Sequence, residues 1–224
     1  MNAAQQGLTI AVDGGGASTL KIFFLLTVLS LLPAIVLSMT AFVRVTIVLS
    51  FLRTALGTPQ LPPNPVLIGL SLFLTFFIIG HTLDDLHERV ARPYFDDEIG
   101  NEEAAARAEV VIKSFIVPQT RDEDLALFYD LARLPPPTSV DDIPLRVAVP
   151  AFLVSELTTA FKMGLYLFVP LVIIDLLVAS VLMSLGMMMV PPQMVALPLK
   201  IAVFLLADGW RLVVAALARS FHGA

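Results

Sequence analysis

The 224-residue chain has 14 basic and 19 acidic side chains, and 57% of its residues are hydrophobic. That share, with a mean hydropathy of +0.86, exceeds the roughly half-apolar composition of soluble domains and predicts a membrane protein. The absence of cysteine excludes disulfides, thiolate metal sites and cysteine catalysis. The sequence has no cluster of basic residues of the kind that binds nucleic acid.

Residues 1–20 are rich in glycine and carry one charge, Asp13. They have neither a basic start nor an apolar core, so they are not a signal peptide. We expect a flexible tail, which is alternatively the remainder left after a signal was removed. The following stretch, Ile22–Val43, has 22 residues without a charge. At about 1.5 Å per residue it is long enough to cross about 30 Å of hydrocarbon.

The segment Arg44–Asn64 is predicted to be a loop, and its only charges are Arg44 and Arg53. Positive charges in a short loop favour the cytoplasmic side. The region Asp84–Val149 has 15 acids against 7 bases and would then lie in the periplasm. Within it, residues 102–115 and 122–134 are expected to be helices, because helix-forming residues follow acids in the first turn.

Three further apolar stretches complete the predicted all-α architecture: Pro65–Leu83, Met163–Met189 and Val195–Ala218. Prolines inside them, such as Pro170 and Pro198, favour kinked helices. We therefore expect membrane-associated kinked helical hairpins and a small helical extracytoplasmic domain. The predicted parts are a tail (1–20), a first hairpin (21–83), an acidic periplasmic domain (84–149) and a second hairpin (150–224).

Charged residues inside apolar stretches are costly and need partners. If the last two stretches form a hairpin around Pro191, Asp175 comes near Asp208 and Arg211 and forms a buried cluster with them. Lys200 then has no acid at its level, and Glu156 has no base on its own helix. Each is expected to pair with the other across neighbouring chains, which requires an offset between copies, as in a spiral.

Met187, Met188 and Met189 lie between an apolar stretch and the Pro191–Pro192 break. Methionine is flexible and polarizable, so a cluster can close around different shapes. Core filling is the ordinary explanation for such a run. In a membrane protein, the same loop is suited to act as a gasket across a pore.

Several strings taken together resemble the FliP/SctR family of type III secretion export-gate proteins, of which FliP is flagellar and SctR virulence-associated. They include Gly-Met-Met-Met-Val-Pro-Pro and Asp-Gly-Trp, and they lie at residues 53–59, 62–64, 72–77, 119–128, 150–157, 174–176, 186–192 and 208–210. The match runs from about residue 20 onward. The string at 119–128 and the Gly-Thr-Pro at 57–59 favour the flagellar branch over the virulence type.

The resemblance implies a non-enzymatic core subunit of the flagellar export gate in the bacterial inner membrane. It implies a ring of five copies, joined by FliQ, FliR and FlhB in the basal body, through which unfolded flagellar subunits pass. It also implies that the three methionines close the pore at rest and that Glu156 and Lys200 bridge adjacent subunits. It implies a spiral packing that largely does not span the lipid, and no cofactor.

Three alternatives remain beside this reading. A virulence-type gate subunit would share the same architecture. An intramembrane enzyme is disfavoured, because His81, His87 and His222 lack metal-ligand spacing and Gly14–Gly16 lacks the Lys-Ser/Thr of a phosphate loop. A small-solute transporter would use Asp175, Lys200 and Asp208 as a relay, but no internal repeat supports it.

Overall fold

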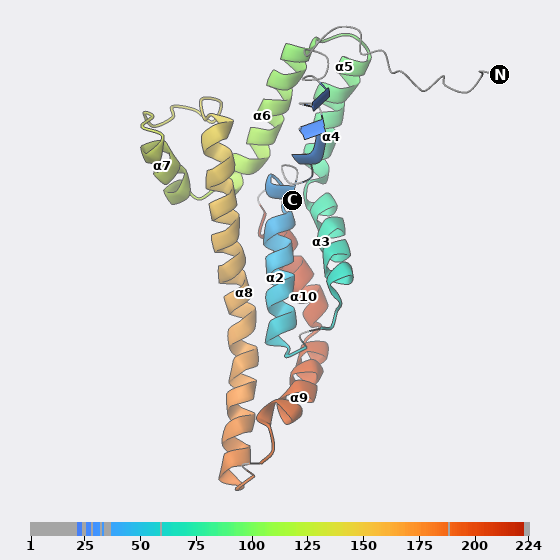
Figure 1. Cartoon of the computed structure of the whole chain (residues 1–224), viewed down its shortest axis with the longest axis vertical. Helices are drawn as coiled ribbons and strands as arrows, with labels where there is room; N and C mark the ends of the chain where they lie inside the picture. The colour runs from blue at the N-terminus through green and yellow to red at the C-terminus, as the bar shows by residue number, and fades with distance from the viewer. Residues whose placement is uncertain are drawn as a thin grey trace, which may run out of the picture. The chain divides into compact units, whose positions relative to one another are not determined.

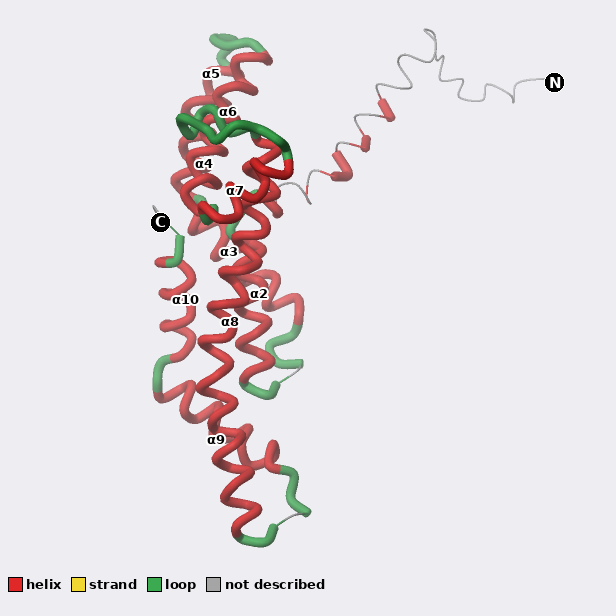
Figure 2. Tube along the Cα trace, turned by 90° about the vertical axis from the view of Figure 1, so that its left-hand side faces the viewer, coloured by secondary structure: helices red, strands yellow, loops and turns green. Residues whose placement is uncertain are grey.

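A computed structural model of the chain describes residues 22–23, 26–27, 29–31, 33, 37–58, 60–187 and 189–221. The predicted tail lies outside these residues, and the first apolar stretch is described only in part. The contacts divide the chain into residues 1–36 and 37–224, and the second unit holds the labelled helices (Figure 1). The prediction of an all-α chain is confirmed for the described residues, which contain helices and turns but no strand (Figure 2).

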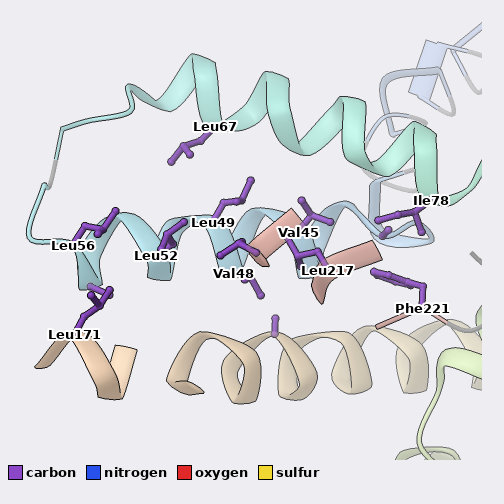
Figure 3. Packing of buried hydrophobic residues seen from close by; sticks show 14 of the residues in the cluster. Val45, Val48, Leu49, Leu52, Leu56, Leu67, Ile78, Leu171, Leu217 and Phe221 are labelled. Atoms are coloured by element: carbon purple, nitrogen blue, oxygen red, sulfur yellow. The ribbon is translucent and has the colours of Figure 1, made fainter. Parts of the chain in front are cut away.

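Helix α2 (Phe42–Ala55) forms the centre of the main hydrophobic core. Its buried side chains recur at helical spacing and include Val45, Val48, Leu49 and Leu52, each at most 1% exposed. Leu67 and Ile78 of α3 (Asn64–Ile78) approach from one side, and Leu217 of α10 (Gly209–Arg219) from another; Figure 3 shows this packing. The segment expected to be a loop from Arg44 is therefore mostly helix. The loop itself is confined to residues 56–63.

Helix α8 (Leu145–Ser184) runs alongside α2 and contains Pro150 and Pro170. Its 40 residues correspond to about 60 Å at 1.5 Å per residue, about twice the hydrocarbon thickness of a bilayer. It is the one helix among the described residues that is both long and apolar enough to cross a membrane. The domain boundary expected at residues 149 and 150 falls inside this continuous helix.

Two other apolar stretches form bent pairs of helices rather than single spans. Helix α3 meets the segment Gly80–Phe95 at 60°, and α9 (Pro192–Leu206) meets α10 at 64°. In the second pair the bend lies at Asp208, which has a left-handed backbone with φ of 52°. Pro198 lies inside α9, and the bend between α9 and α10 lies at the break after Leu206.

The acidic region consists of two parts. The first is a helical arm of α4 (Gly80–Leu86), the π-helix η1 (His87–Ala91) and α5 (Arg92–Phe95), which returns along α6 (Asn101–Gln119). The second is α7 (Asp122–Leu131), which packs on the start of α8. The two helices expected at 102–115 and 122–134 are thus confirmed, with small shifts at their ends.

A second hydrophobic cluster joins α6, α7 and the start of α8. Its most buried members are Ile116, Ala148 and Phe152, all 0% exposed. The link between α6 and α7 is fixed to α8 by Ser155, whose hydroxyl accepts a hydrogen bond from the Arg121 amide at 2.9 Å. Arg121 also binds both carboxylate oxygens of Asp124, at 2.8 and 2.9 Å. The polar start of α7 is therefore anchored at Ser155, the residue before Glu156 in α8.

The loop between α7 and α8 contains a carboxylate-centred turn. Asp142 Oδ2 accepts hydrogen bonds from the hydroxyls of Thr138 and Ser139, at 2.6 and 2.9 Å, and from the Ser139 amide at 3.0 Å. These bonds favour the ionised form, so the hydroxyl of Thr138, followed by that of Ser139, lowers the pKa of Asp142 below its usual 3.8.

We expect Asp142→Ala to reduce the unfolding temperature at neutral pH and to have less effect as the pH falls. The folded pKa lies below the unfolded one, so the carboxylate contributes stability above pH ~4, which is lost as the pH drops through the folded value. Thermal unfolding in detergent from about pH 7 to about pH 2 measures this. Asp130→Ala, on the exposed side of α7, is the control. A difference between wild type and Asp142→Ala that does not shrink in acid contradicts the assignment.

The turn between α8 and α9 follows from a helix-ending glycine. Gly186 has φ of +73°; its amide donates to Met183 O, and the Met187 amide donates to Leu182 O. This is the hydrogen-bond pattern of a Schellman motif, in which a left-handed residue closes the helix. Pro192 then opens α9 as a residue that needs no amide partner. The acidic region and this turn lie at opposite ends of α8 (Figure 1).

Candidate functional site

The most deeply buried charges of the described chain are Arg44 of α2 and Glu156 of α8, which are 2% and 0% exposed. The Arg44 Nε donates to Glu156 Oε2 at 2.9 Å, and its Nη2 donates to Oε1. The two contacts give the bidentate geometry that a planar guanidinium forms with a carboxylate. This pair joins the two helices that share the largest packing surface.

Arg44 also binds the end of α10. Its Nη1 donates to the carbonyl and the hydroxyl of Ser220, at 2.7 and 3.0 Å. Its guanidinium lies 3.7 Å from the centre of the Phe221 ring, a cation–π geometry, and that ring stacks on Phe115 of α6. One cation therefore ties together α2, α6, α8 and the segment after α10.

The second buried ion is Lys200 of α9, which is 4% exposed. Its Nζ donates to Asp175 Oδ2 of α8 at 2.5 Å and to the carbonyl of Ala55, the last residue of α2, at 2.9 Å. A cavity of about 220 Å³ adjoins the pair and is also lined by Thr54, Gly57 and Gln193. The pair thus fixes the α8–α9 hairpin to the end of α2.

The expectation that Glu156 and Lys200 lack partners in their own chain is wrong. Glu156 has Arg44, and Lys200 has Asp175. The register of the hairpin explains the second error, because the turn closed by Gly186 is centred near residue 188 rather than at Pro191. The pairing of Glu156 with Lys200 across chains stays a prediction, but it can no longer be argued from a lack of partners within the chain.

The buried cluster expected from Asp175, Asp208 and Arg211 is not formed. Asp208 and Arg211 face each other at 3.8 Å, but their side chains are 67% and 84% exposed. Asp208 occupies the bend between α9 and α10, and Asp175 of α8 pairs with Lys200 instead. An exposed pair of this kind contributes little to the stability of the chain.

The methionine turn, residues 187–189, carries exposed apolar side chains. Met187 is 44% and Met189 is 96% exposed, and Met188 lies outside the described residues. Exposed leucines and valines continue from the turn along both adjoining helices: Leu176, Leu177, Val181, Leu185, Leu199 and Leu206. Apolar surfaces of this extent are typical of sites that contact a membrane or another protein.

Metal chemistry has no support in the described part of the chain, where no group of three or more His, Asp or Glu side chains is arranged to hold an ion. His81 and His87 lie on α4 and η1, and His222 lies outside the described residues.

Comparison with known proteins identifies the relatives of this chain. The model of the FliP family matches residues 25–217. The chain belongs to the FliP family. It is 52% identical to the flagellar biosynthetic protein FliP of Bacillus subtilis over 92% of its own length and 93% of the relative. It is 47% identical to that of Aquifex aeolicus, over 94% and 89%, and 50% identical to that of Pectobacterium carotovorum, over 94% and 82%.

Sequence reasoning missed Arg44 as a site residue, because it was assigned to a loop. A signal was present, since Arg44 lies between Ala41-Phe42-Val43 and the apolar run Val45–Leu52. A lone arginine within an apolar segment is a buried charge that requires a partner. The aromatic partners Phe115 and Phe221 carried no such signal.

Proposed function

We propose that the chain is a core subunit of the flagellar protein-export gate in the bacterial inner membrane. Membership of the FliP family and the name of its relatives, flagellar biosynthetic protein, support a component of flagellar export. The helix α8 is long and apolar enough to cross a membrane, which supports a membrane location. The role is that of a structural channel subunit, not of an enzyme.

The observation that carries the proposal is the exposed methionine turn at the end of α8. In a ring of copies, the turns would converge and close the pore by apolar contact, with Met187, Met188 and Met189 as the gasket. A flexible thioether lining seals at rest and adapts to a passing unfolded chain. We propose five copies, with FliQ, FliR and FlhB as further subunits and unfolded flagellar proteins as the substrates.

Replacement of all three methionines by alanine is expected to leave the assembly intact and to make the membrane leaky to ions, because alanine is too short to fill the constriction. Planar-bilayer conductance of the purified assembly measures the leak. A matched control is Met194→Ala, which removes a methionine that is 72% exposed on α9 outside the turn. An assembled triple variant with unchanged conductance overturns the gasket.

The proposed topology places the acidic region in the periplasm and the loop 56–63 with the methionine turn on the cytoplasmic side. The opposite positions of the acidic region and the turn along α8 support this (Figure 1). We expect a cysteine at Val140 to react with an impermeant thiol reagent in intact spheroplasts. One at Gln60 should react only after lysis. No native cysteine interferes. The reverse labelling pattern would invert the topology.

The alternatives differ in their expected assembly. A small-solute transporter would run as a monomer or dimer, whereas a gate forms a large complex with unlike partners. The mass of the complex purified in mild detergent separates these two. A virulence-type gate subunit is disfavoured by the flagellar names of the relatives, and loss of flagellar filaments in a deletion strain tests that distinction.

A further inference from the structure

The point where the helical arm turns from α5 into α6 carries two exposed aromatic side chains. We name residues 92–103 the arm tip. Phe95 is 79% exposed and Tyr94 is 41% exposed. Helices α4, η1 and α5 have no buried residue, so the arm offers its tip no apolar cover. A large ring held in water at the end of an arm is a candidate for an interaction anchor.

The arm tip is ordered by its own contacts. The Tyr94 hydroxyl donates a hydrogen bond to Asn101 Oδ1 at 2.9 Å. The Phe95 and Tyr94 rings meet edge to face, with their centres 5.9 Å apart. The amide of Glu98 donates to Pro93 O at 2.9 Å, and Ile99 is buried behind the turn at 9% exposure. The backbone that carries Phe95 is therefore held in a defined turn, which reduces the ordering entropy lost on binding.

The surroundings of Phe95 are acidic. The arm tip has five carboxylates, of Asp96, Asp97, Glu98, Glu102 and Glu103, against the single base Arg92. Arg92 contacts Asp96 at 3.8 Å, and Glu103 pairs with Arg107. The structure gives no ion pair to Asp97, Glu98 or Glu102 within the described residues. An apolar anchor surrounded by unpaired acids is complementary to an apolar socket with a basic rim.

We propose that the arm tip docks on a second, different protein by inserting Phe95 into an apolar socket lined by lysine or arginine at its edge. A membrane surface is disfavoured, because anionic headgroups repel the carboxylates. A second copy of the chain is also disfavoured. The second copy would offer an apolar hollow with a lysine, around Phe161 and Lys162 of α8. That hollow lies about 24 Å along α8 from its first residue, which is the end near the arm. Copies in one membrane share their orientation, so the arm tip of one copy and this hollow of its neighbour would lie at different heights. This proposal is independent of the gate.

The test is photo-cross-linking of the full chain in flagellated cells with p-benzoylphenylalanine in place of Phe95, which keeps an aromatic ring at the anchor. We expect an adduct with an unlike protein, joined at a peptide that has lysine or arginine beside apolar residues. Reversal of two rim charges, Glu98→Lys with Glu102→Lys, should lower the yield about tenfold. The matched control, Glu123→Lys with Asp130→Lys, makes the same charge change on α7 and should leave the yield unchanged.

Other outcomes overturn the proposal. An adduct between two copies assigns the arm tip to self-association, and an adduct with lipid assigns it to the membrane. If no adduct forms, Phe95 is not an interaction anchor. An adduct equally sensitive to both charge reversals reduces the effect to net charge. Phe95→Ala separates binding from folding, because a ring that is 79% exposed should leave the unfolding temperature of the purified chain unchanged. A drop in that temperature shows that the ring supports the fold.

Discussion

Glu156→Ala is expected to lower the free energy of unfolding by about 3–5 kcal/mol, because it breaks the buried ion pair with Arg44. Removal of the carboxylate leaves Arg44 as a buried cation that is 2% exposed and retains only the neutral oxygens of Ser220 and the Phe221 ring. Denaturation of the purified protein in detergent measures the loss. Arg53→Ala is the control on the same helix, because Arg53 is partly exposed and bonds to Pro62 O and Asn64 Oδ1.

Two charge exchanges identify the partner of Glu156. If the pair is Arg44–Glu156 within the chain, the double variant Arg44→Glu/Glu156→Arg should recover part of the stability lost by either single reversal. If Glu156 pairs with Lys200 of a neighbouring chain, Glu156→Lys/Lys200→Glu should recover ring yield instead. A double variant that does no better than either of its single charge reversals shows that the corresponding pairing is wrong.

Gly164→Leu is expected to destabilise the chain by about 3 kcal/mol or more, because it overpacks a tight contact between α2 and α8. A Cβ at Gly164 would lie 2.6 Å from Cγ and 3.0 Å from Cβ of Phe51. Atoms this near the backbone cannot swing away, so the helices must separate. Detergent unfolding and the yield of folded protein report the effect.

Gly69→Ala provides the matched control, since a Cβ there meets nothing within 4 Å. It should be neutral or stabilising, because alanine favours a helix by about 1 kcal/mol over glycine. Phe51→Ala combined with Gly164→Leu should cost less than the two changes added together. Strict additivity of the two would refute the contact between these positions.

The sequence was informative where local chemistry decides the structure. Helices α6 and α7 begin with acid-rich first turns, and α7 ends a few residues before the Pro135–Pro137 run. Their positions were predicted within a few residues, apart from the end of α6. The end of α8 was harder, because apolar composition continues through Met189 although the helix stops at Ser184. The left-handed Gly186, not the hydropathy, sets that boundary.

The candidate site was less predictable because its pairs are distant in the sequence. Arg44 and Glu156 are 112 residues apart, and no spacing rule connects positions across two packed helices. The partners of Lys200 and Asp175 were predicted wrongly because the centre of the loop between α8 and α9 was placed about three residues too late. Such a shift changes the residue that faces a given position by about two turns of helix. The sequence shows which charged residues lie in apolar segments and need partners, but the packing of the helices decides which charges meet.

The contacts of Arg44 have a consequence for biosynthesis. Its carboxylate partner is 112 residues later in the chain, and its Ser220 partner is 176 residues later. At about 5–20 residues per second, the ribosome needs roughly 6–22 s to reach Glu156 and roughly 9–35 s to reach Ser220. During that interval Arg44 has no counter-ion, and burial of its charge in an apolar environment is costly. Helix α2 therefore completes its packing only after α8 and the residues that follow α10 have been made, so the central helix of the core is among the first to be translated and among the last to settle.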